Sequence, residues 1–468
     1  MKTSRRNFIK TSLGASTGIF IIPRYALGKG FVAPSDKIRV AGIGIGGRGW
    51  ENINACSTSP YVEIAALCDV DDRQSKRARK QFPKATYYKD YRKMLDTEDL
   101  DAVIISTPDH MHAIQGMDAM NRGLHVYIEK PLSHDIAEAR ELAELAAKKN
   151  LVTQMGNQGA SREGVRLMQE WYRAGLIGLV EEVFVWTNRP VWPQGISWNN
   201  LKSGNSPEGL DWDLWLGTAP LESYKENLLP FNWRGWWDYG TGALGDMACH
   251  LIEPAFTTLN LGYPTSVEAS VGSVYTGPFQ RAYYPKSCPP SSHIVLNFPM
   301  QNNLPDLKMH WMDGGIQPER PSELGANDLM GDGGNGVIIR GSKGVIMCDT
   351  YSDNARLLPK SIQEQARMVK KSNPRVKEGH HLQWINAIRA GFDKAKTSSS
   401  FDISGPLTES VLMGNLALRS YDYRQKSKSG SWTYPGRNIK LNWDGPNMKV
   451  TNFDEANQFI KRKYRTGW

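Results

Sequence analysis

Three polar residues have the types and the spacing that proton transfer at a hydroxyl group requires. Lys130 precedes Pro131 at the end of an apolar run, and Asp246 and His250 stand four positions apart. In a helix, this spacing places both side chains on one face. Oxidation of a secondary alcohol needs a base for the hydroxyl proton and a donor for the developing alkoxide, and histidine titrates near neutral pH. We therefore interpret Lys130, Asp246 and His250 as the candidate catalytic group.

In this interpretation, Lys130 and His250 transfer the proton, and Asp246 orients the substrate or Lys130. Each assignment has a structural alternative. In the alternative, Lys130 is a surface lysine whose aliphatic stem lies on apolar side chains. Asp246 is then a helix cap, and His250 is a buried histidine with satisfied hydrogen bonds. The elements that position these residues decide between the two interpretations.

A glycine-rich turn supplies the next chemical feature. Gly42, Gly44 and Gly47 follow an apolar run in G-x-G-x-x-G spacing, which is typical of a turn that lets the backbone approach a pyrophosphate. The phosphates then lie at the start of the next helix, where unpaired N–H groups attract an anion. Gly46 and Arg48 in the same turn are further candidate contacts. The turn therefore predicts a dinucleotide cofactor.

Asp69 ends the second apolar run, 22 positions after Gly47. This is close to the spacing expected of a carboxylate that binds the cofactor ribose. A carboxylate there favours NAD, because it would repel a 2′-phosphate, whereas nearby Arg73 and Lys76 leave NADP open. The structural alternative is that Asp69 only caps a loop.

The N-terminal half alternates between short apolar runs and helical patterns, which predicts crossover units and a doubly wound parallel sheet. The expected strands lie at 38–43, 62–69, 85–88, 101–108, 125–128 and 151–155, and the helices at 71–81, 91–96, 111–122 and 135–149. Ligands bind such sheets beyond the carboxyl ends of the strands. Polar residues gather at those predicted ends, and we expect them beside the cofactor: Thr107, Asp109, His112, Glu129 and Gln158. Glu129 alternatively holds the Lys130 region together.

Beyond residue 159 the pattern changes to strands that alternate in polarity, after a helix at 163–174. The strands are expected at 180–187, 266–275, 292–298, 306–312, 336–341 and 345–349, with helices at 381–391 and 407–423 and a basic surface loop at 363–379. This predicts a second α/β domain with a large open, mainly antiparallel sheet. In the Trp- and Pro-rich stretch 189–239, Trp233 and Arg234 are candidate cofactor or sugar contacts, although core packing explains the tryptophan equally well.

The N-terminus resembles an export signal. Ser4-Arg-Arg-Asn-Phe-Ile-Lys10 fits a twin-arginine (Tat) signal, and the apolar run 13–22 is too short to anchor the chain in a membrane. We therefore predict a signal peptide at 1–30, the Tat machinery as a partner and a periplasmic location. The predicted parts of the remaining chain are a nucleotide-binding domain at 31–158, a substrate and oligomerisation domain at 159–445 and a tail at 446–468.

Composition excludes several classes of site. Cleavage of the predicted signal near Ala26 would remove five basic residues and lower the formal charge from +9 to +4. A charge of +4 is too small to indicate nucleic acid binding. The five cysteines include no C-x-x-C pair and give no disulfide framework. His110 and His112 lack a matching set of ligands, so no metal is expected.

The chain resembles the glucose–fructose oxidoreductase / inositol dehydrogenase (Gfo/Idh/MocA) family. The resemblance rests on the glycine turn, Asp69, Thr107-Pro-Asp-His with His112, Glu129-Lys-Pro131, and Asp246-x-x-x-His250. It implies a Rossmann domain followed by an α/β domain whose open sheet makes oligomer contacts, hence a homo-oligomer. It also implies NAD or NADP as cofactor, a sugar or glycoside as substrate, and Lys130, Asp246 and His250 as the catalytic group.

Export constrains the reaction, because nicotinamide cofactors are not recycled in bulk outside the cytoplasm. We expect NAD to be loaded before export and to stay tightly bound. The main hypothesis is oxidation of a secondary hydroxyl of a sugar or glycoside, of the glycoside 3-dehydrogenase type. The alternative is a redox-neutral glycosidase, lyase or epimerase that acts through a transient ketosugar. The NAD-dependent glycosidases of the family tend to carry a Tyr-and-His signature where this chain has Asp246 and His250, which favours the oxidoreductase. A non-catalytic NAD-containing binding protein is the third hypothesis.

Overall fold

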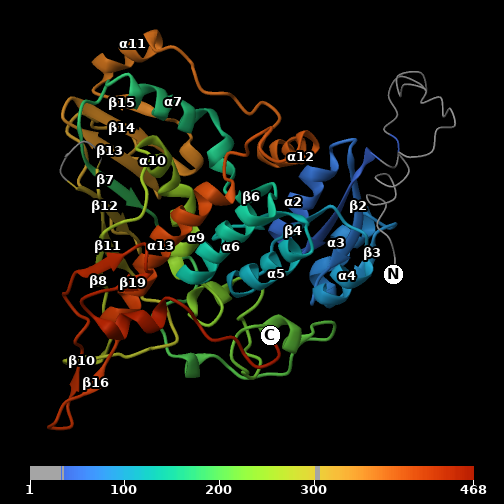
Figure 1. Ribbon diagram of the computed structural model, residues 1–468. Coiled ribbons are helices and arrows are strands. Elements are labelled where there is room, and N and C mark those ends of the chain that lie inside the picture. The colour runs from blue at the N-terminus through green and yellow to red at the C-terminus, as the bar shows by residue number, and fades with distance from the viewer. Residues whose placement is uncertain (1–32, 34–35, 301–305) are drawn as a thin grey trace. The chain divides into compact units, whose positions relative to one another are not determined.

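The N-terminal sheet consists of six parallel strands in the order β3-β2-β1-β4-β5-β6 (Figure 1). The structure is a computed structural model that describes residues 33, 36–300 and 306–468. The strands are β1 (Ile38–Ile43), β2 (Val62–Cys68), β3 (Thr86–Tyr88), β4 (Ala102–Ile105), β5 (His125–Glu129) and β6 (Thr153–Gly156). Near-continuous apolar runs form β1, β2 and β4, as expected of parallel strands that are covered on both faces. The predicted Rossmann sheet is confirmed.

Each helix of this sheet begins just beyond the carboxyl end of a strand. The helices are α2 (Gly47–Ser57), α3 (Asp72–Gln81), α4 (Tyr91–Thr97), α5 (Asp109–Asn121) and α6 (Ile136–Lys149). Aspartates cap three of them: Asp71 and Asp90 accept from backbone N–H groups of α3 and α4, and Asp135 forms a capping box with Glu138 at α6. The caps fix where the chain turns from strand to helix, which is where the candidate residues lie.

The C-terminal sheet has nine strands in the order β15-β14-β13-β7-β12-β11-β8-β18-β19. Its strands are β7 (Val180–Trp186), β8 (Ser266–Val271), β11 (Ser292–Phe298), β12 (Leu307–Met312), β13 (Gly336–Gly341), β14 (Gly344–Cys348), β15 (Arg356–Leu358), β18 (Leu441–Asp444) and β19 (Lys449–Val450). Among these, β7 and β12 pair in parallel and every other neighbouring pair is antiparallel. The predicted large, mainly antiparallel sheet is confirmed.

Two helices differ from the prediction. The basic stretch 363–379 is not wholly a loop, because α11 (Lys360–Met368) occupies its first part and buries Ile362. The long helix α13 (Phe401–Asp422) begins before Pro406, although proline removes a backbone donor. Its first turn is held by burial of Phe401, whose N–H donates to the Thr153 hydroxyl over 3.0 Å. Long-range packing therefore decides where α13 starts.

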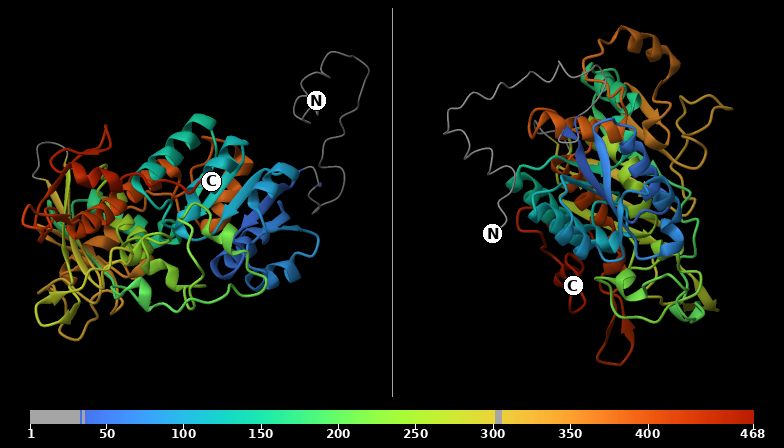
Figure 2. Two further views of the ribbon diagram at one scale, coloured as in Figure 1. Left: turned by 90° about the horizontal axis from the view of Figure 1, so that it is seen from below. Right: turned by 90° about the vertical axis from the view of Figure 1, so that its right-hand side faces the viewer.

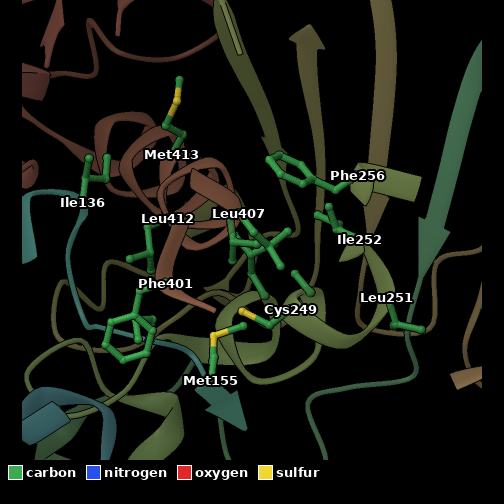
Figure 3. Packing of buried hydrophobic residues seen from close by; sticks show 14 of the residues in the cluster. Ile136, Met155, Cys249, Leu251, Ile252, Phe256, Phe401, Leu407, Leu412 and Met413 are labelled. Atoms are coloured by element: carbon green, nitrogen blue, oxygen red, sulfur yellow. The ribbon is translucent and has the colours of Figure 1, made fainter. Parts of the chain in front are cut away.

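A single apolar core joins the two sheets. Figure 3 shows Ile136 and Met155, from the nucleotide-binding sheet and its helix α6, beside Phe401 and Leu412 of α13. Cys249, from α9 (Gly242–Leu251), belongs to the same cluster. Figures 1 and 2 show α13 and α9 between the two sheets. This shared core fixes α9, which carries Asp246 and His250, relative to β5, which precedes Lys130.

The described part of the chain forms one unit from Ile38 to Trp468, and the predicted signal at 1–30 lies outside the described residues. All five cysteines are buried and free. No helix among the described residues is both long and apolar enough to span a bilayer. The predicted domain limits at 158 and 445 stay predictions.

Glu253 is a buried carboxyl group at the start of α10 (Glu253–Thr258). Its side chain accepts from Thr257 over 3.2 Å through one oxygen, and the other oxygen has no partner within the described ranges. Burial raises its pKa to about 7. A carboxyl group whose pKa is raised in the folded state contributes its full stability at pH values below its pKa in the unfolded chain. That contribution is lost as the pH rises through its pKa in the folded protein.

Replacing Glu253 with Gln is therefore expected to stabilise the protein at high pH. Between about pH 5 and about pH 8.5, the free energy of unfolding of Glu253→Gln should gain about 3 kcal/mol relative to the original protein. Thermal unfolding at both pH values measures the difference. Glu364→Gln, at an exposed position of α11, is the matched control and should show no such trend. If the free energies of unfolding of Glu253→Gln and the original protein differ by the same amount at both pH values, the raised pKa of Glu253 is contradicted.

Candidate active site

A cavity of about 620 Å³ lies at the carboxyl ends of the parallel strands. Its wall contains thirteen of the sixteen predicted site residues: Gly44, Gly46, Gly47, Arg48, Asp69, Thr107, Asp109, Glu129, Lys130, Trp233, Arg234, Asp246 and His250. The other three, Gly42, His112 and Gln158, are not part of this wall. The polar strand ends therefore converge on one site, as the sheet topology predicts.

Lys130 and Asp246 form an ion pair inside this cavity. The Nζ atom of Lys130 lies 2.8 Å from Oδ1 of Asp246 and also donates to the Asp246 carbonyl. Nε of Arg234 lies 3.2 Å from the same Oδ1 atom. Burial alone would raise the pKa of Asp246, but Lys130 and Arg234 beside it lower that pKa to about 2. Asp246 is therefore ionised and paired with Lys130; its role in orienting Lys130 or the substrate stays a prediction.

His250 is placed as a neutral proton acceptor. Nδ1 lies 2.8 Å from Oδ1 of Asn157, and the amide of Asn157 is oriented by donating its own N–H to the Cys249 carbonyl over 2.8 Å. His250 must therefore donate from Nδ1, which leaves the lone pair on Nε2. Burial, together with Lys130, lowers the pKa of His250 well below its usual range. The ring is neutral at pH 7 and can take a proton.

The glycine turn fits a dinucleotide. Gly44 has a φ of +74°, and a Cβ there would lie 2.8 Å from the Ser106 carbonyl. At Gly42, a Cβ would lie 2.2 Å from Ile53 of α2, so this glycine lets the helix pack on β1. Helix α2 starts after Gly46 without a side-chain cap or an acidic residue in its first turn. Its first N–H groups are thus left for an anion, which is what a bound pyrophosphate requires.

Asp69 ties this turn to the loop after β2. One carboxylate oxygen accepts from the N–H of Ile45 and the other from the N–H of Asp71, both over 2.9 Å. Burial raises the pKa of Asp69 to about 6, although these hydrogen bonds oppose the shift. Asp69 thus makes the contacts of a loop cap, which was the structural alternative, while it also lines the cavity. Its contact with the ribose stays a prediction.

Polar residues outside the wall form hydrogen bonds with residues that line it or adjoin it. Both ring nitrogens of His112 lie 2.7 Å from carbonyl oxygens, those of Thr107 and Pro131. The Gln158 amide donates to Glu129 over 3.1 Å. Asn52 of α2 also donates to Glu129, over 2.9 Å, so this carboxylate joins α2 to the end of β5. These are the contacts that the alternative prediction for Glu129 requires, in which it holds the Lys130 region together.

Aromatic rings position Arg234. Its guanidinium lies 4.4 Å from the ring centroids of both Phe231 and Trp233. Trp233 is buried and donates its indole N–H to the Pro230 carbonyl over 3.0 Å. The Trp-rich stretch therefore carries a packed aromatic cluster that presents Arg234 to Asp246.

Tyr351 lies in the site although no sequence motif indicated it. It belongs to η7 (Thr350–Ser352), between β14 and β15, and its ring centroid lies 4.7 Å from that of His250. Tyr351 has a φ of 60° and Ser352 of 62°, a left-handed conformation that is strained in residues with a Cβ. A Cβ at Gly159 would lie 2.9 Å from Tyr351 Cα, so this glycine gives the segment room.

Two family models match this chain, one in the nucleotide-binding part and one in the C-terminal part. Residues 38–157 match the model described as "Oxidoreductase family, NAD-binding Rossmann fold", and residues 179–274 match "Oxidoreductase family, C-terminal alpha/beta domain". The chain belongs to the Gfo/Idh/MocA oxidoreductase family. NAD is the cofactor of the first domain, and the uncapped glycine turn fits it. No group of three or more His, Cys, Asp or Glu side chains in the described part is arranged to hold a metal ion.

Curated relatives match only part of this chain. The alpha-N-acetylgalactosaminidase of Shewanella oneidensis is 30% identical over 201 residues, which cover 37% of this chain and 43% of the relative. The chain therefore matches less than half the length of this curated relative.

Solved structures share the fold. The WlbA dehydrogenase of Chromobacterium violaceum, solved with NADH and UDP-GlcNAcA, has a TM-score of 0.55 at 19% identity, covering 83% of this chain and 96% of that one. Levoglucosan dehydrogenase, solved with NADH and levoglucosan, has a TM-score of 0.53 at 18% identity, covering 85% of this chain and 100% of that one.

Proposed function

We propose that this protein oxidises a secondary hydroxyl group of a sugar or glycoside and transfers the hydride to a tightly bound NAD. The observation that carries the proposal is the convergence of Lys130, Asp246 and His250 on the cavity that the glycine turn also lines. The sugar and nucleotide-sugar ligands with which levoglucosan dehydrogenase and WlbA were solved support the substrate class. The chemistry that bound NAD supplies is acceptance of the hydride.

Lys130 is suited to stabilise the oxygen of the reacting hydroxyl group. An ammonium group has three N–H donors, and two of them are directed to the carbonyl and carboxylate oxygens of Asp246. The third remains for the substrate oxygen, where negative charge develops as the proton leaves. Asp246 pairs with this ammonium group at the wall of the cavity.

His250 is suited to take the hydroxyl proton. Its Nε2 carries the lone pair, because Nδ1 donates to Asn157. The proton of the hydroxyl group passes to Nε2 while the hydride leaves the carbinol carbon, so that the alcohol becomes a ketone. Asn157 fixes the tautomer and the ring orientation of His250, which makes it a positioning residue.

Retention of the cofactor is part of the proposal. We propose that the N-terminal Ser4-to-Lys10 motif directs the folded protein through the twin-arginine machinery to the periplasm, with NAD already bound. A second substrate must then take the hydride back for the enzyme to complete its cycle. A homo-oligomer is also proposed, on the resemblance of the C-terminal sheet to those of the family.

The second candidate function is a redox-neutral glycosidase. It is supported by the 30% identity to the alpha-N-acetylgalactosaminidase and by Tyr351, which brings a tyrosine beside His250 from a distant segment. In this reaction, the transient ketone acidifies the neighbouring C–H group, and a base removes that proton as the aglycone leaves with a proton. Water then adds to the double bond so formed, and the hydride returns to the ketone carbon of the sugar. No net reduction of NAD remains at the end.

One pair of assays separates the candidates. Purified protein is mixed with methyl glycosides and, separately, with p-nitrophenyl glycosides that include the N-acetyl-α-D-galactosaminide. The oxidoreductase proposal predicts a ketosugar and one equivalent of bound NADH, seen by its near-ultraviolet absorbance, without release of p-nitrophenol. Release of p-nitrophenol without net NADH would establish the glycosidase instead. Neither product with any member of the panel would contradict both and favour a binding protein.

Replacing Tyr351 with Phe tests whether the tyrosine hydroxyl contacts the substrate. Since Phe keeps the ring against His250, we expect about a 10-fold lower kcat/KM on the best glycoside of the panel and an unchanged NAD content. Tyr275→Phe, on the exposed β9 (Tyr275–Gly277), is the matched control. Wild-type kinetics in Tyr351→Phe would limit this residue to packing.

A further inference from the structure

The C-terminal tail leaves the nine-stranded sheet at β19 and returns to the nucleotide-binding domain. It passes through η8 (Asp454–Phe459), which packs on α13, and ends at Trp468 (Figure 1). Predicted from sequence only as a tail at 446–468, this segment has a defined path because several of its side chains make buried contacts.

Arg462 is the main anchor of the tail. Its guanidinium donates to Glu138 of α6 over 2.9 Å, to the Thr218 hydroxyl over 2.9 Å and to the His110 carbonyl of α5. Tyr464 donates to the same carboxylate of Glu138 over 2.8 Å. The tail is therefore fixed to two helices of the nucleotide-binding domain.

Trp468 is held at the wall of the cavity. The guanidinium of Arg92 lies 4.3 Å from its ring centroid, and Asp90 fixes Arg92 through a bond of 2.8 Å between Nη2 and Oδ2. Arg465, three positions before Trp468, donates to the Gly217 carbonyl over 2.9 Å. Trp468 lines the active-site cavity together with Asp90 and Tyr91. Its ring is thus part of the site although it is far from the site motifs in sequence.

A second segment closes the same side of the cavity. The Gly209 carbonyl accepts from the N–H of Asp72 over 3.0 Å and from Lys89, and the N–H of Asp211 donates to the Val70 carbonyl over 2.9 Å. These bonds attach the Trp-rich stretch to the loops that follow β2 and β3. Helix α8 (Trp212–Leu216), which follows directly, adds Leu214 and Trp215 to the wall.

The location of these contacts identifies the part of NAD that they face. The start of α2 marks the pyrophosphate, and Lys130 and His250 mark the reacting nicotinamide end. The loops after β2 and β3 lie on the opposite side of the glycine turn, where Asp69 is, and this is the side of the adenosine half.

We propose that the tail from Asp454 to Trp468 is a clasp over the adenosine half of NAD, with Trp468 as its contact residue. An aromatic ring stabilises a neighbouring purine by stacking and excludes water from it. Because the tail is anchored by buried ion pairs, NAD can leave only when the clasp opens. This inference rests on the proposed function, in which NAD stays bound to the protein. The clasp would explain why NAD stays bound.

Trp468→Ala in the full chain tests the clasp. Protein loaded with NADH is chased with excess NAD, and the loss of bound NADH fluorescence gives the dissociation rate. We expect the rate to rise at least about 10-fold in Trp468→Ala, and to change little in Trp468→Phe, which keeps an aromatic ring. Trp432→Ala, a half-exposed tryptophan of the separate strand β17 (Trp432–Thr433), is the matched control and should behave as the wild type.

Arg465→Ala provides an independent variant that leaves the ring intact but removes the contacts with Gly217 and Asp213 that hold the last residues of the tail. It should also accelerate dissociation, with the melting temperature showing that the fold is kept. An unchanged dissociation rate in both Trp468→Ala and Arg465→Ala would overturn the clasp. The ratio of the variant to the wild-type dissociation rate tests the clasp. The wild-type dissociation rate itself tests whether NAD is a resident cofactor. Loss of NADH from the wild type within seconds would contradict the resident cofactor even if the ratio held.

Discussion

Lys130→Met is expected to lower turnover of the best glycoside substrate by about 10²–10⁴-fold while NAD stays bound. The substitution keeps the apolar stem but removes the ammonium group that faces Asp246 and the substrate oxygen. The developing alkoxide then loses its donor. The measurement is the single-turnover rate of NADH formation, combined with the amount of nucleotide that the denatured protein releases.

The control for Lys130→Met is Lys202→Met, at a lysine whose side chain is 78% exposed. It should match the wild type in both readouts. Unchanged turnover in Lys130→Met would remove Lys130 from the mechanism. Loss of NAD together with turnover would show that Lys130 maintains the site and is not a catalytic residue.

Gly44→Ala is expected to abolish NAD binding almost completely, with at least about a 100-fold weaker affinity. A Cβ at Gly44 would lie 2.8 Å from the Ser106 carbonyl carbon and oxygen, which belong to the backbone and cannot swing away. The turn must then open, and it carries the N–H groups that face the pyrophosphate. Nucleotide content after desalting and the melting temperature measure the effect.

Gly123→Ala is the matched control for this substitution. Gly123 also has a positive φ, +84°, but it is exposed, lies outside the cavity wall, and a Cβ there would meet nothing within 4 Å. It should cost about 1–2 kcal/mol of stability through the left-handed backbone and leave NAD in place. Equal loss of NAD in the two variants would assign the effect to backbone strain alone, against close packing at Gly44.

The nucleotide-binding half of the fold could be predicted from sequence because its signals are local. Buried parallel strands give continuous apolar runs, aspartates cap the helices that follow, and the turn between β1 and α2 needs glycines. Because strand ends meet at one edge, the sequence also indicated that Asp69, Thr107 and Lys130 share a site.

The rest of the site depends on long-range contacts that no motif records. Tyr351 reaches His250 through a left-handed turn at the end of β14, and Trp468 reaches the cavity through the path of the tail. For Asp69, spacing left the ribose contact and the loop cap open, and the carboxylate accepts from the N–H groups of Ile45 and Asp71, as a loop cap does. The partners of Tyr351 and Trp468 are fixed by tertiary packing, and no motif in the sequence marks either residue.

The measurement that tests the central claim most directly is the nucleotide content of the purified wild-type protein. After extensive desalting and denaturation, mass spectrometry identifies the released nucleotide, and absorbance gives its amount per chain. NAD or NADH close to one equivalent is the predicted result, since the proposed clasp would hold NAD against the glycine turn as a resident cofactor. An empty protein, or one that holds NADP, would contradict it.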